Sequence, residues 1–189
     1  MKTLIRDIQV FGTASMIVTL TLFSMGTAGC EKKEPPLSKE VLSLKQEVKE
    51  RIEKYAPAFI DPLSRKNKAA VQEAMARLSL ELTRGGQPLT WGAAVLDTEG
   101  VALGSCTSGG PQAGLNYSNI KPVTEALKYQ KMTQGKFYRQ DGFCAYYVLK
   151  PLTHQGRFVG LFVLGLSAKE LIENKGVSEK EFLAIDFNQ

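Results

Sequence analysis

Apolar residues are most concentrated between residues 143 and 166, where two hydrophobic segments flank a short polar one. Residues 143–152 and 157–166 are rich in Val, Leu, Phe and Tyr, and residues 153–156 contain turn-forming types. In the second segment, apolar side chains occupy both sets of alternate positions, as Phe162 and Val163 illustrate. Because alternate residues of a strand point to opposite faces, the pattern predicts a hairpin whose second strand is covered on both faces. We expect that strand to be central in a sheet.

A helical period precedes the strands. Ser38 is a suitable N-cap, and Pro57 is expected to stop the helix. The spacing of three and four places the apolar residues on one side of this helix, which therefore needs a surface to pack against. These residues are Val41, Leu44, Val48, Ile52 and Tyr55.

A second helix is predicted between Asp61 and Gly86. Asp61 would cap it, Pro62 would occupy its first position, and Gly85 and Gly86 would end it. Its apolar row consists of Val71, Met75, Leu78 and Leu82.

From residue 90 the period changes to that of strands. Residues 91–96 and 101–106 predict a first hairpin, joined by a turn at 97–100, and a Gly-rich loop follows at 107–117.

A short helix is then expected, with Pro122 in its first turn and Ile120, Val123 and Leu127 as its apolar positions. Gly135 is expected to end the helical region before a strand at 137–140. Asp141 and Gly142 would form the turn into the central hairpin.

A last helix is expected to start at Ser167 and to include Leu171 and Ile172. The tail that follows, to Gln189, is amphipathic but too short to assign to an element.

Composition favours one globular domain and disfavours most catalytic chemistry. The chain is 43% hydrophobic, and its formal net charge of +5 is scattered rather than gathered in a basic stripe, so no nucleic acid partner is expected. The one histidine, His154, lies in the hairpin turn, which disfavours a metal site or a histidine relay. Asp97 and Glu99 are explained by turn chemistry, and the Gly-rich loop lacks the Gly-Lys-Ser/Thr ending of a phosphate cradle. We therefore expect no enzymatic activity and no cofactor.

The first 30 residues have the layout of an export signal. Lys2 and Arg6 precede an apolar stretch at residues 10–25, and small residues precede Cys30. This segment resembles a bacterial lipoprotein signal, although Thr27 stands where that family usually has leucine. The resemblance implies a signal peptide at 1–29 and a palmitate-bearing lipid on Cys30. The alternative is an uncleaved membrane helix.

Residues 30–37 are charged and proline-bearing, which predicts a solvated tether to the membrane. By the same resemblance, Glu31 in place of aspartate favours the outer membrane, facing the periplasm, in a Gram-negative host. Either reading of the signal places the rest of the chain in the cell envelope, outside the cytoplasm.

The order of elements resembles the extracytoplasmic PAS-like domains called Cache, in their single-module form. The resemblance covers residues 38–172 and rests on AVLDTEG (94–100), VTEALKYQKMTQGKF (123–137), LKP (149–151) and GRFVGLFVLGLSAKEL (156–171). It implies an α+β fold at 38–189, a PAS-like five-stranded antiparallel sheet. A long N-terminal helix would cover one face, and the Gly-rich loop and short helix the other. Members of that family usually bind a small metabolite between the sheet and the loop.

A pocket at that place would draw its polar groups from the loop, the short helix and the late strands. Tyr146 and Tyr147 lie on opposite faces of one strand, and parity alone does not say which of them faces the pocket. A carboxylate is the favoured ligand if a cation enters, with Arg139 suited to bidentate binding. The alternative is that the tyrosines are core or rim residues and the cations are solvated. The candidate ligand-binding residues are Tyr117, Lys121, Tyr138, Arg139, Tyr146 and Lys150.

Cys106 and Cys144 are the other two cysteines, and an exported domain makes them a candidate disulfide. Two separate thiols are the alternative, because the implied sheet order does not make their strands neighbours. A reversible dithiol sensor is a third, more remote hypothesis.

The favoured function is a lipid-anchored, extracytoplasmic sensory domain that binds a small molecule and signals through a separate envelope or receptor protein. The alternative is a non-enzymatic structural or interaction lipoprotein, with a degenerate pocket, that holds another envelope protein.

Overall fold

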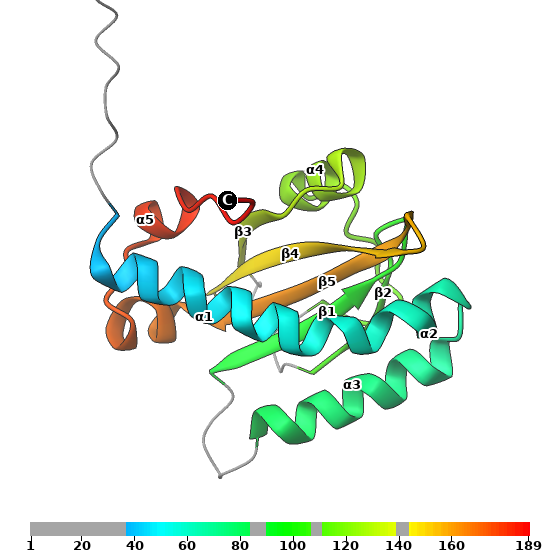
Figure 1. Cartoon of the computed structure of the whole chain (residues 1–189). Coiled ribbons are helices and arrows are strands. Elements are labelled where there is room, and N and C mark those ends of the chain that lie inside the picture. The colour runs from blue at the N-terminus through cyan, green and yellow to red at the C-terminus, as the bar shows by residue number, and fades with distance from the viewer. Residues whose placement is uncertain (1–36, 84–89, 107–110, 139–143) are drawn as a thin grey trace, which may run out of the picture. The chain divides into compact units, whose positions relative to one another are not determined.

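Helices open the described part of the chain, and five strands follow with one helix inserted among them (Figure 1). The computed structural model describes residues 37–83, 90–106, 111–138 and 144–189. Its elements are α1 (Lys39–Tyr55), the 3-10 helix η1 (Ala56–Phe59), α2 (Ile60–Ser64), α3 (Lys68–Thr83), β1 (Trp91–Leu96), β2 (Ala102–Ser105), α4 (Lys121–Tyr129), β3 (Thr133–Tyr138), β4 (Cys144–His154), β5 (Arg157–Ser167), the π-helix η2 (Glu170–Asn174) and α5 (Glu179–Leu183).

The strands form one antiparallel sheet in the order β2-β1-β5-β4-β3. β5 lies in the middle, paired with β1 on one side and with β4 on the other, as the sequence pattern predicted. The β4–β5 hairpin turns at Gln155 and Gly156, whose φ angles of 50° and 75° are those of a tight two-residue turn. The predicted PAS-like α+β fold is therefore confirmed.

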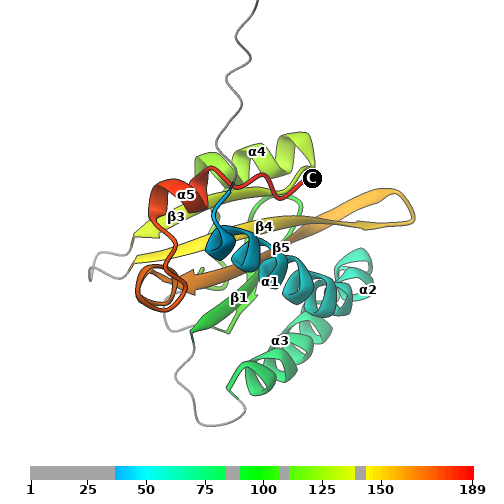
Figure 2. The same cartoon turned by 60° about the vertical axis from the view of Figure 1, so that its left-hand side comes forward.

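Each face of the sheet is covered by its own hydrophobic cluster. Phe162 and Leu164 of β5 belong to the cluster beneath α1, α2 and α3, whereas Leu161 and Val163 belong to the cluster beneath α4. Figures 1 and 2 both show α4 on the opposite side of the sheet from α1. All four of these side chains are buried, and full burial of one such side chain stabilises the fold by about 2 kcal/mol.

α1 forms as its sequence pattern predicts. The Ser38 hydroxyl accepts a hydrogen bond of 3.2 Å from the backbone N–H of Val41 and thereby caps the helix. The helix ends at Tyr55, and Pro57 then stands in the first turn of η1, where its missing N–H costs no hydrogen bond. The buried side chains of α1 are Val41, Leu44, Val48 and Ile52.

The predicted start of the second helix is wrong. Asp61 lies inside α2, which continues from η1, and Lys66 adopts a left-handed φ of 53° that interrupts the helix. α3 then begins anew at Lys68, and the Asn67 side chain accepts a hydrogen bond of 3.1 Å from the backbone N–H of Ala70. The cap is therefore asparagine six residues later than expected, and the predicted terminators Gly85 and Gly86 lie outside the described residues.

Gly135 does not end the helical region. α4 already ends at Tyr129, where Gln130 takes the left-handed conformation of a C-cap, and β3 starts at Thr133. Gly135 is a buried residue of β3, paired with Tyr147. Glycine is needed there because an added Cβ would lie 2.7 Å from Cγ of Pro122 and 2.8 Å from the hydroxyl oxygen of Tyr147.

The C-terminal segment folds back over the α1 side of the sheet. The predicted last helix is present from Ala168, and Ser167 Oγ accepts a hydrogen bond of 3.1 Å from the N–H of Glu170. α5 follows with a capping box between Ser178 and Glu181. The sequence pattern assigned no element to this tail, yet four of its residues belong to the α1 cluster, and each is no more than 1% exposed: Val177, Phe182, Ile185 and Phe187.

Two side-chain amides fasten this segment to the edge of the sheet. Asn188 accepts a hydrogen bond from the N–H of Met132 (2.9 Å) and donates one to its carbonyl (3.0 Å). The Gln134 amide donates to the carbonyls of Leu183 (3.0 Å) and Ile185 (2.6 Å). These contacts satisfy backbone groups of Met132, just before β3, and of the C-terminal segment itself.

In the described part of the chain, no helix combines the length and the apolar character needed to cross a membrane. The predicted signal peptide at 1–29 and the lipidated Cys30 lie outside the described residues, as does the tether except for Leu37, so these three assignments stay predictions.

Gly160→Ala should destabilise the fold by about 2 kcal/mol or more, because the residue has a φ of 148° and its Cβ would lie 2.5 Å from the carbonyl oxygen of Leu96. Gly104→Ala is the matched control, since a Cβ there meets only Met75 atoms at 3.7 Å. Chemical denaturation should give a clearly lower free energy of unfolding for Gly160→Ala alone. Equal values for the two variants would contradict this account of the β1–β5 contact.

Candidate functional site

The face of the sheet beneath α4 is lined almost entirely by hydrocarbon. In the part of the chain that the structure describes, Glu170 is the one polar or charged residue classed as buried, and it belongs to η2 on the other side. The α4 face therefore carries no buried charge among the described residues. Its buried members are Ala94, Leu96, Ala102, Val123, Ala126, Tyr147, Leu149, Leu161 and Val163.

The hydroxyl of Tyr147 is a polar group on this otherwise apolar face. Its side chain is 8% exposed, and its hydroxyl oxygen is buried without a hydrogen-bond partner among the described residues. Burial raises the pKa of this phenol to about 12, so it stays protonated and is an available donor. The hydroxyl lies against Gly135 and Pro122, at the junction of β3 and α4.

Tyr117 is the candidate residue that the structure places beside this face. Its ring is half-buried and meets the ring of Phe137 edge-on at 6.4 Å. Its hydroxyl accepts a hydrogen bond of 2.7 Å from the N–H of Gln112. This contact joins two residues of the described part of the Gly-rich loop, just before α4 begins at Lys121.

Two further candidates point into solvent, and a third is not described. The Lys121 side chain is 86% exposed, with its ammonium 4.0 Å from Glu125. Tyr138 is 65% exposed at the end of β3, where the Lys136 ammonium lies 4.5 Å from its ring centre. Arg139 lies outside the described residues, so its predicted binding of a carboxylate stays a prediction.

Tyr146 and Lys150 face the α1 side of the sheet. Tyr146 is 1% exposed, and its hydroxyl donates a hydrogen bond of 2.9 Å to Oε2 of Glu179. The Lys136 ammonium binds the same carboxylate oxygen, so β3, β4 and α5 meet at one polar contact. The six candidates therefore do not form one cluster, and their assignment as ligand-binding residues stays a prediction.

Burial first, and the hydrogen bond to Glu179 second, raise the pKa of Tyr146 to about 12. The pKa of the Glu179 carboxyl is lowered, chiefly by the hydrogen bond from Lys136 and then by that from Tyr146. The pKa of Lys136 is raised by the same carboxylate. The contact is therefore an ionised pair with a neutral phenol beside it at neutral pH.

The candidate disulfide is not formed. Cys106 and Cys144 are both free thiols. Cys106 follows β2 and Cys144 begins β4, and two strands, β1 and β5, lie between β2 and β4 in the sheet. Burial raises the pKa of both thiols, which lowers their reactivity at neutral pH. A bridge within one chain would require a different strand order.

Turn chemistry accounts for Asp97, as predicted. Its Oδ1 accepts hydrogen bonds of 2.9 Å from the N–H groups of Glu99 and Val101, and Gly100 has a φ of 82°. Among the described residues, no group of three His, Cys, Asp or Glu side chains is placed to hold a metal ion.

Sequence reasoning recognised that Tyr146 and Tyr147 lie on opposite faces of one strand but left open which of them faces α4; the structure places Tyr147 on that side. Choosing between them requires knowing which face α4 covers. That information lies in the contact between Gly135, Pro122 and Tyr147, because only a residue without a side chain lets the phenol reach α4. The sequence signal is Gly135 itself, which lies within β3 and does not end a helix.

No family model matches the chain, and no curated protein matches it. Several solved structures share its fold. The ligand-binding domain of the Pseudomonas fluorescens chemoreceptor CtaA, in complex with L-serine, gives a TM-score of 0.54 at 16% identity over 74% of this chain and 60% of that chain. The ligand-binding domain of the Pseudomonas aeruginosa PAO1 amino acid chemoreceptor PctB, in complex with L-Gln, gives a TM-score of 0.51 at 11% identity over 75% of this chain and 57% of that chain. A domain of a Vibrio parahaemolyticus protein described as sensory box/GGDEF family gives a TM-score of 0.55 at 13% identity over 75% of this chain and 60% of that chain.

These similarities confirm the PAS-like fold that the sequence resemblance implied, and identities this low extend to the fold alone. The chain spans no more than 60% of the length of those three chains.

Adjacent tyrosines of β4 should respond in opposite directions to loss of the hydroxyl. Tyr147→Phe should raise the free energy of unfolding by about 1 kcal/mol, because it removes a buried, unpaired polar group. Tyr146→Phe should lower it, because it removes a hydrogen bond to Glu179. Urea denaturation of both variants provides the measurement, and a clear loss of stability in Tyr147→Phe would contradict the assignment of its hydroxyl as unpaired.

The Glu179 contact should make stability depend on acid pH. A carboxyl with a lowered pKa in the folded state contributes stability above its ordinary value of 4.5, and this contribution is lost as pH falls through the lower folded value. Glu179→Gln should therefore reduce the fall in stability below pH 4.5. The exposed Glu73 gives the control Glu73→Gln, which should keep the original pH profile. Identical acid profiles for the two variants would remove this role from Glu179.

Proposed function

We infer that this chain is an extracytoplasmic sensory domain that binds a small molecule between the sheet and α4. The observation that carries this proposal is the buried, unpaired hydroxyl of Tyr147. The PAS-like fold, shared with ligand-binding domains of chemoreceptors, supports the same place and the same class of function. Binding without chemical turnover is proposed, because the candidate catalytic carboxylate Asp97 is engaged by its own turn.

A buried hydroxyl without a partner is unfavourable in the isolated protein. Burying such a group without a hydrogen bond costs about 1–3 kcal/mol relative to its hydration in the unfolded chain. A ligand that accepts its hydrogen bond recovers this free energy on binding. The neighbouring Gly135 leaves the hydroxyl in contact with the base of α4 instead of filling that space with a side chain.

The walls of this face favour a ligand that is small and mostly apolar. Leu149, Leu161 and Val163 present hydrocarbon, and no charged residue among those described is buried on this side. We therefore favour a ligand less polar than the amino acids named for CtaA and PctB, with one group that accepts a hydrogen bond. A carboxylate ligand would need the cation of Arg139.

The finer parts of the proposal rest on the N-terminal sequence. A lipid on Cys30 would hold the domain at the membrane through the tether, and in a Gram-negative host Glu31 favours the outer membrane. Occupancy would then pass to a separate envelope or receptor protein. The long α1 is suited to transmit it, because it follows the tether directly and packs on the sheet.

One observation favours the second candidate function, an interaction lipoprotein with a degenerate pocket. The α4 cluster is continuous, and three buried side chains within it are less than 1% exposed, namely Ala126, Leu149 and Leu161. If this face is already filled, the fold serves as a scaffold, and its helices would contact a protein partner instead. Ligand-dependent stabilisation distinguishes the two functions.

A thermal-shift screen of residues 31–189 tests the proposal, because both hydrophobic clusters lie within residues 41–187. At about 100 times its Kd, a ligand that binds only the native state stabilises it by about 2.7 kcal/mol, a rise of about 5–10 °C in the midpoint. We expect small, weakly polar metabolites to give this rise. Tyr147→Phe should reduce it by at least half, whereas the exposed-tyrosine control Tyr129→Phe should keep it. Absence of any shift across the panel, or an equal shift in Tyr147→Phe, would favour the scaffold function.

A further inference from the structure

A groove of about 660 Å³ opens on the α1 side of the sheet, away from α4. α1 and η1 form one wall, the second half of β4 forms the opposite wall, and the segment before β3 closes one end with Asn188. The groove exists because β3 starts at Thr133, opposite Leu149, so β4 has no neighbouring strand on this side from Lys150 onward. We call this space the lysine groove.

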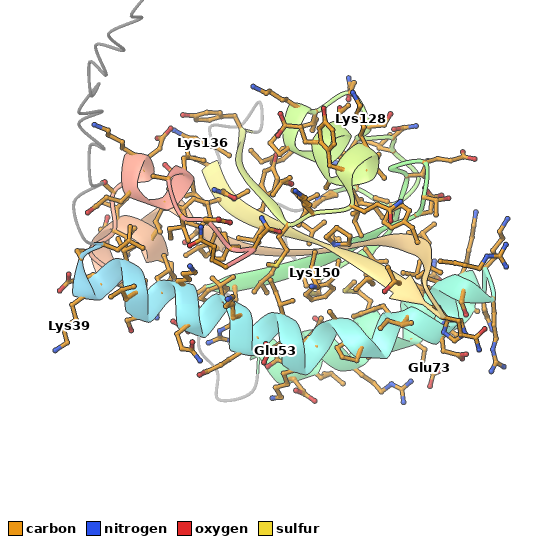
Figure 3. All side chains as sticks on the ribbon, turned by 45° about the horizontal axis from the view of Figure 1, so that its top comes forward. Lys39, Glu53, Glu73, Lys128, Lys136 and Lys150 are labelled. Atoms are coloured by element: carbon orange, nitrogen blue, oxygen red, sulfur yellow. The ribbon has the colours of Figure 1, made fainter. Side chains whose placement is uncertain are left out.

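Its base is apolar and its rim is basic. Ile52 of α1 and Leu152 of β4 are buried side chains that line it, together with Ile60 and Met132. Three lysines, Lys49, Lys131 and Lys150, line the same space against one carboxylate, Glu53. Figure 3 shows Lys150 on the strand side and Glu53 on α1.

The charges of the groove are not neutralised within the described chain. Lys49 donates to the backbone carbonyl of Gln189, and none of the ion pairs among the described residues joins Glu53 to a groove lysine. Lys150 is half-buried, and its ammonium has no hydrogen bond or ion pair with another described residue. A partly desolvated cation beside hydrocarbon gains most from an anion that brings its own apolar surface.

The geometry points to a second ligand site in the lysine groove, for an amphiphilic anion. Its head group, a carboxylate or a phosphate, would lie between the ammonium groups of Lys150 and Lys131. Its hydrocarbon would lie on Ile52, Ile60 and Leu152. The volume is within the range of about 300–1,000 Å³ that is typical of small-molecule sites.

An added peptide strand fits this groove less well. The open edge of β4 includes Pro151, which has no N–H to donate, so a strand placed beside it would find an incomplete hydrogen-bond ladder. Side-chain cations and hydrocarbon, not backbone groups, are what the groove offers.

Isothermal titration tests the proposal, with decanoate and decyl phosphate below their micelle concentrations and decanol below its solubility limit. We expect at least one of the two anions to bind and decanol to bind more weakly. Lys150→Gln should weaken binding of the anion about fivefold to tenfold, the loss of one charge-assisted contact. Lys128→Gln is the matched control, because Lys128 lies on α4, on the other side of the sheet (Figure 3). The relative affinities of decanoate and decyl phosphate distinguish a carboxylate from a phosphate head group.

Methyl NMR of the same titration locates the ligand. The methyl groups of Ile52, Ile60 and Leu152 should shift, whereas that of Val163, in the α4 cluster, should not. Failure of both anions to bind, equal affinity in Lys150→Gln, or shifts confined to Val163 would each overturn the proposal. Binding of an acidic peptide in the groove without binding of either anion would overturn it as well, in favour of a protein-docking surface.

Discussion

Strand β5 must be shielded from water on both faces, and the rest of the structure depends on this. Its apolar residues alternate between the two hydrophobic clusters, with Phe162 and Leu164 on one side and Leu161 and Val163 on the other. β1 and β4 satisfy its backbone groups along both edges. A strand of this kind is stable only when the chain supplies a separate cover for each face. The helices before the sheet, the helix within it and the segment after it provide those covers.

The two covers differ in how firmly they are attached. On the α1 side, a capped helix of 17 residues packs beside α2, α3 and the C-terminal segment, which Gln134, Asn188 and Glu179 fasten to β3 and β4. On the other side, α4 has nine residues and contributes only Val123 and Ala126 to the fully buried set. Because less apolar area is removed from water there, displacing α4 costs less free energy than displacing α1. Of the two covers, α4 is therefore the one that a ligand at the proposed site would displace more easily.

Local chemistry predicted most of the fold, and long-range contacts account for what it missed. The two hairpins, the Ser38 cap and the Asp97 turn follow from residues close in sequence and are present, whereas the strand predicted at 137–140 starts earlier, as β3 at Thr133. The position of Gly135 within β3 depends on Pro122 and Tyr147, which are both more than ten residues from it in sequence, so local patterns do not reveal it. The packing of Phe182 and Phe187 could not be predicted either, because the pattern of a short amphipathic tail does not indicate which surface it covers. For the site, the alternation of side chains along β4 placed Tyr146 and Tyr147 on opposite faces of the sheet but did not show which face α4 covers.

β4 makes the two sides of the sheet dependent on each other. Tyr147 and Leu149 contact the α4 cluster, while Tyr146 and Lys150 face α1, so successive residues of one backbone border both proposed sites. Any shift of β4 that accommodates a ligand beneath α4 must also move the Lys150 wall of the lysine groove. If the shift changes the affinity of one site, thermodynamic reciprocity requires that a ligand at the other site change the first affinity by the same factor. Because β4 is paired with β5 along its length, a shift of this kind would pass along β4 as a packed strand.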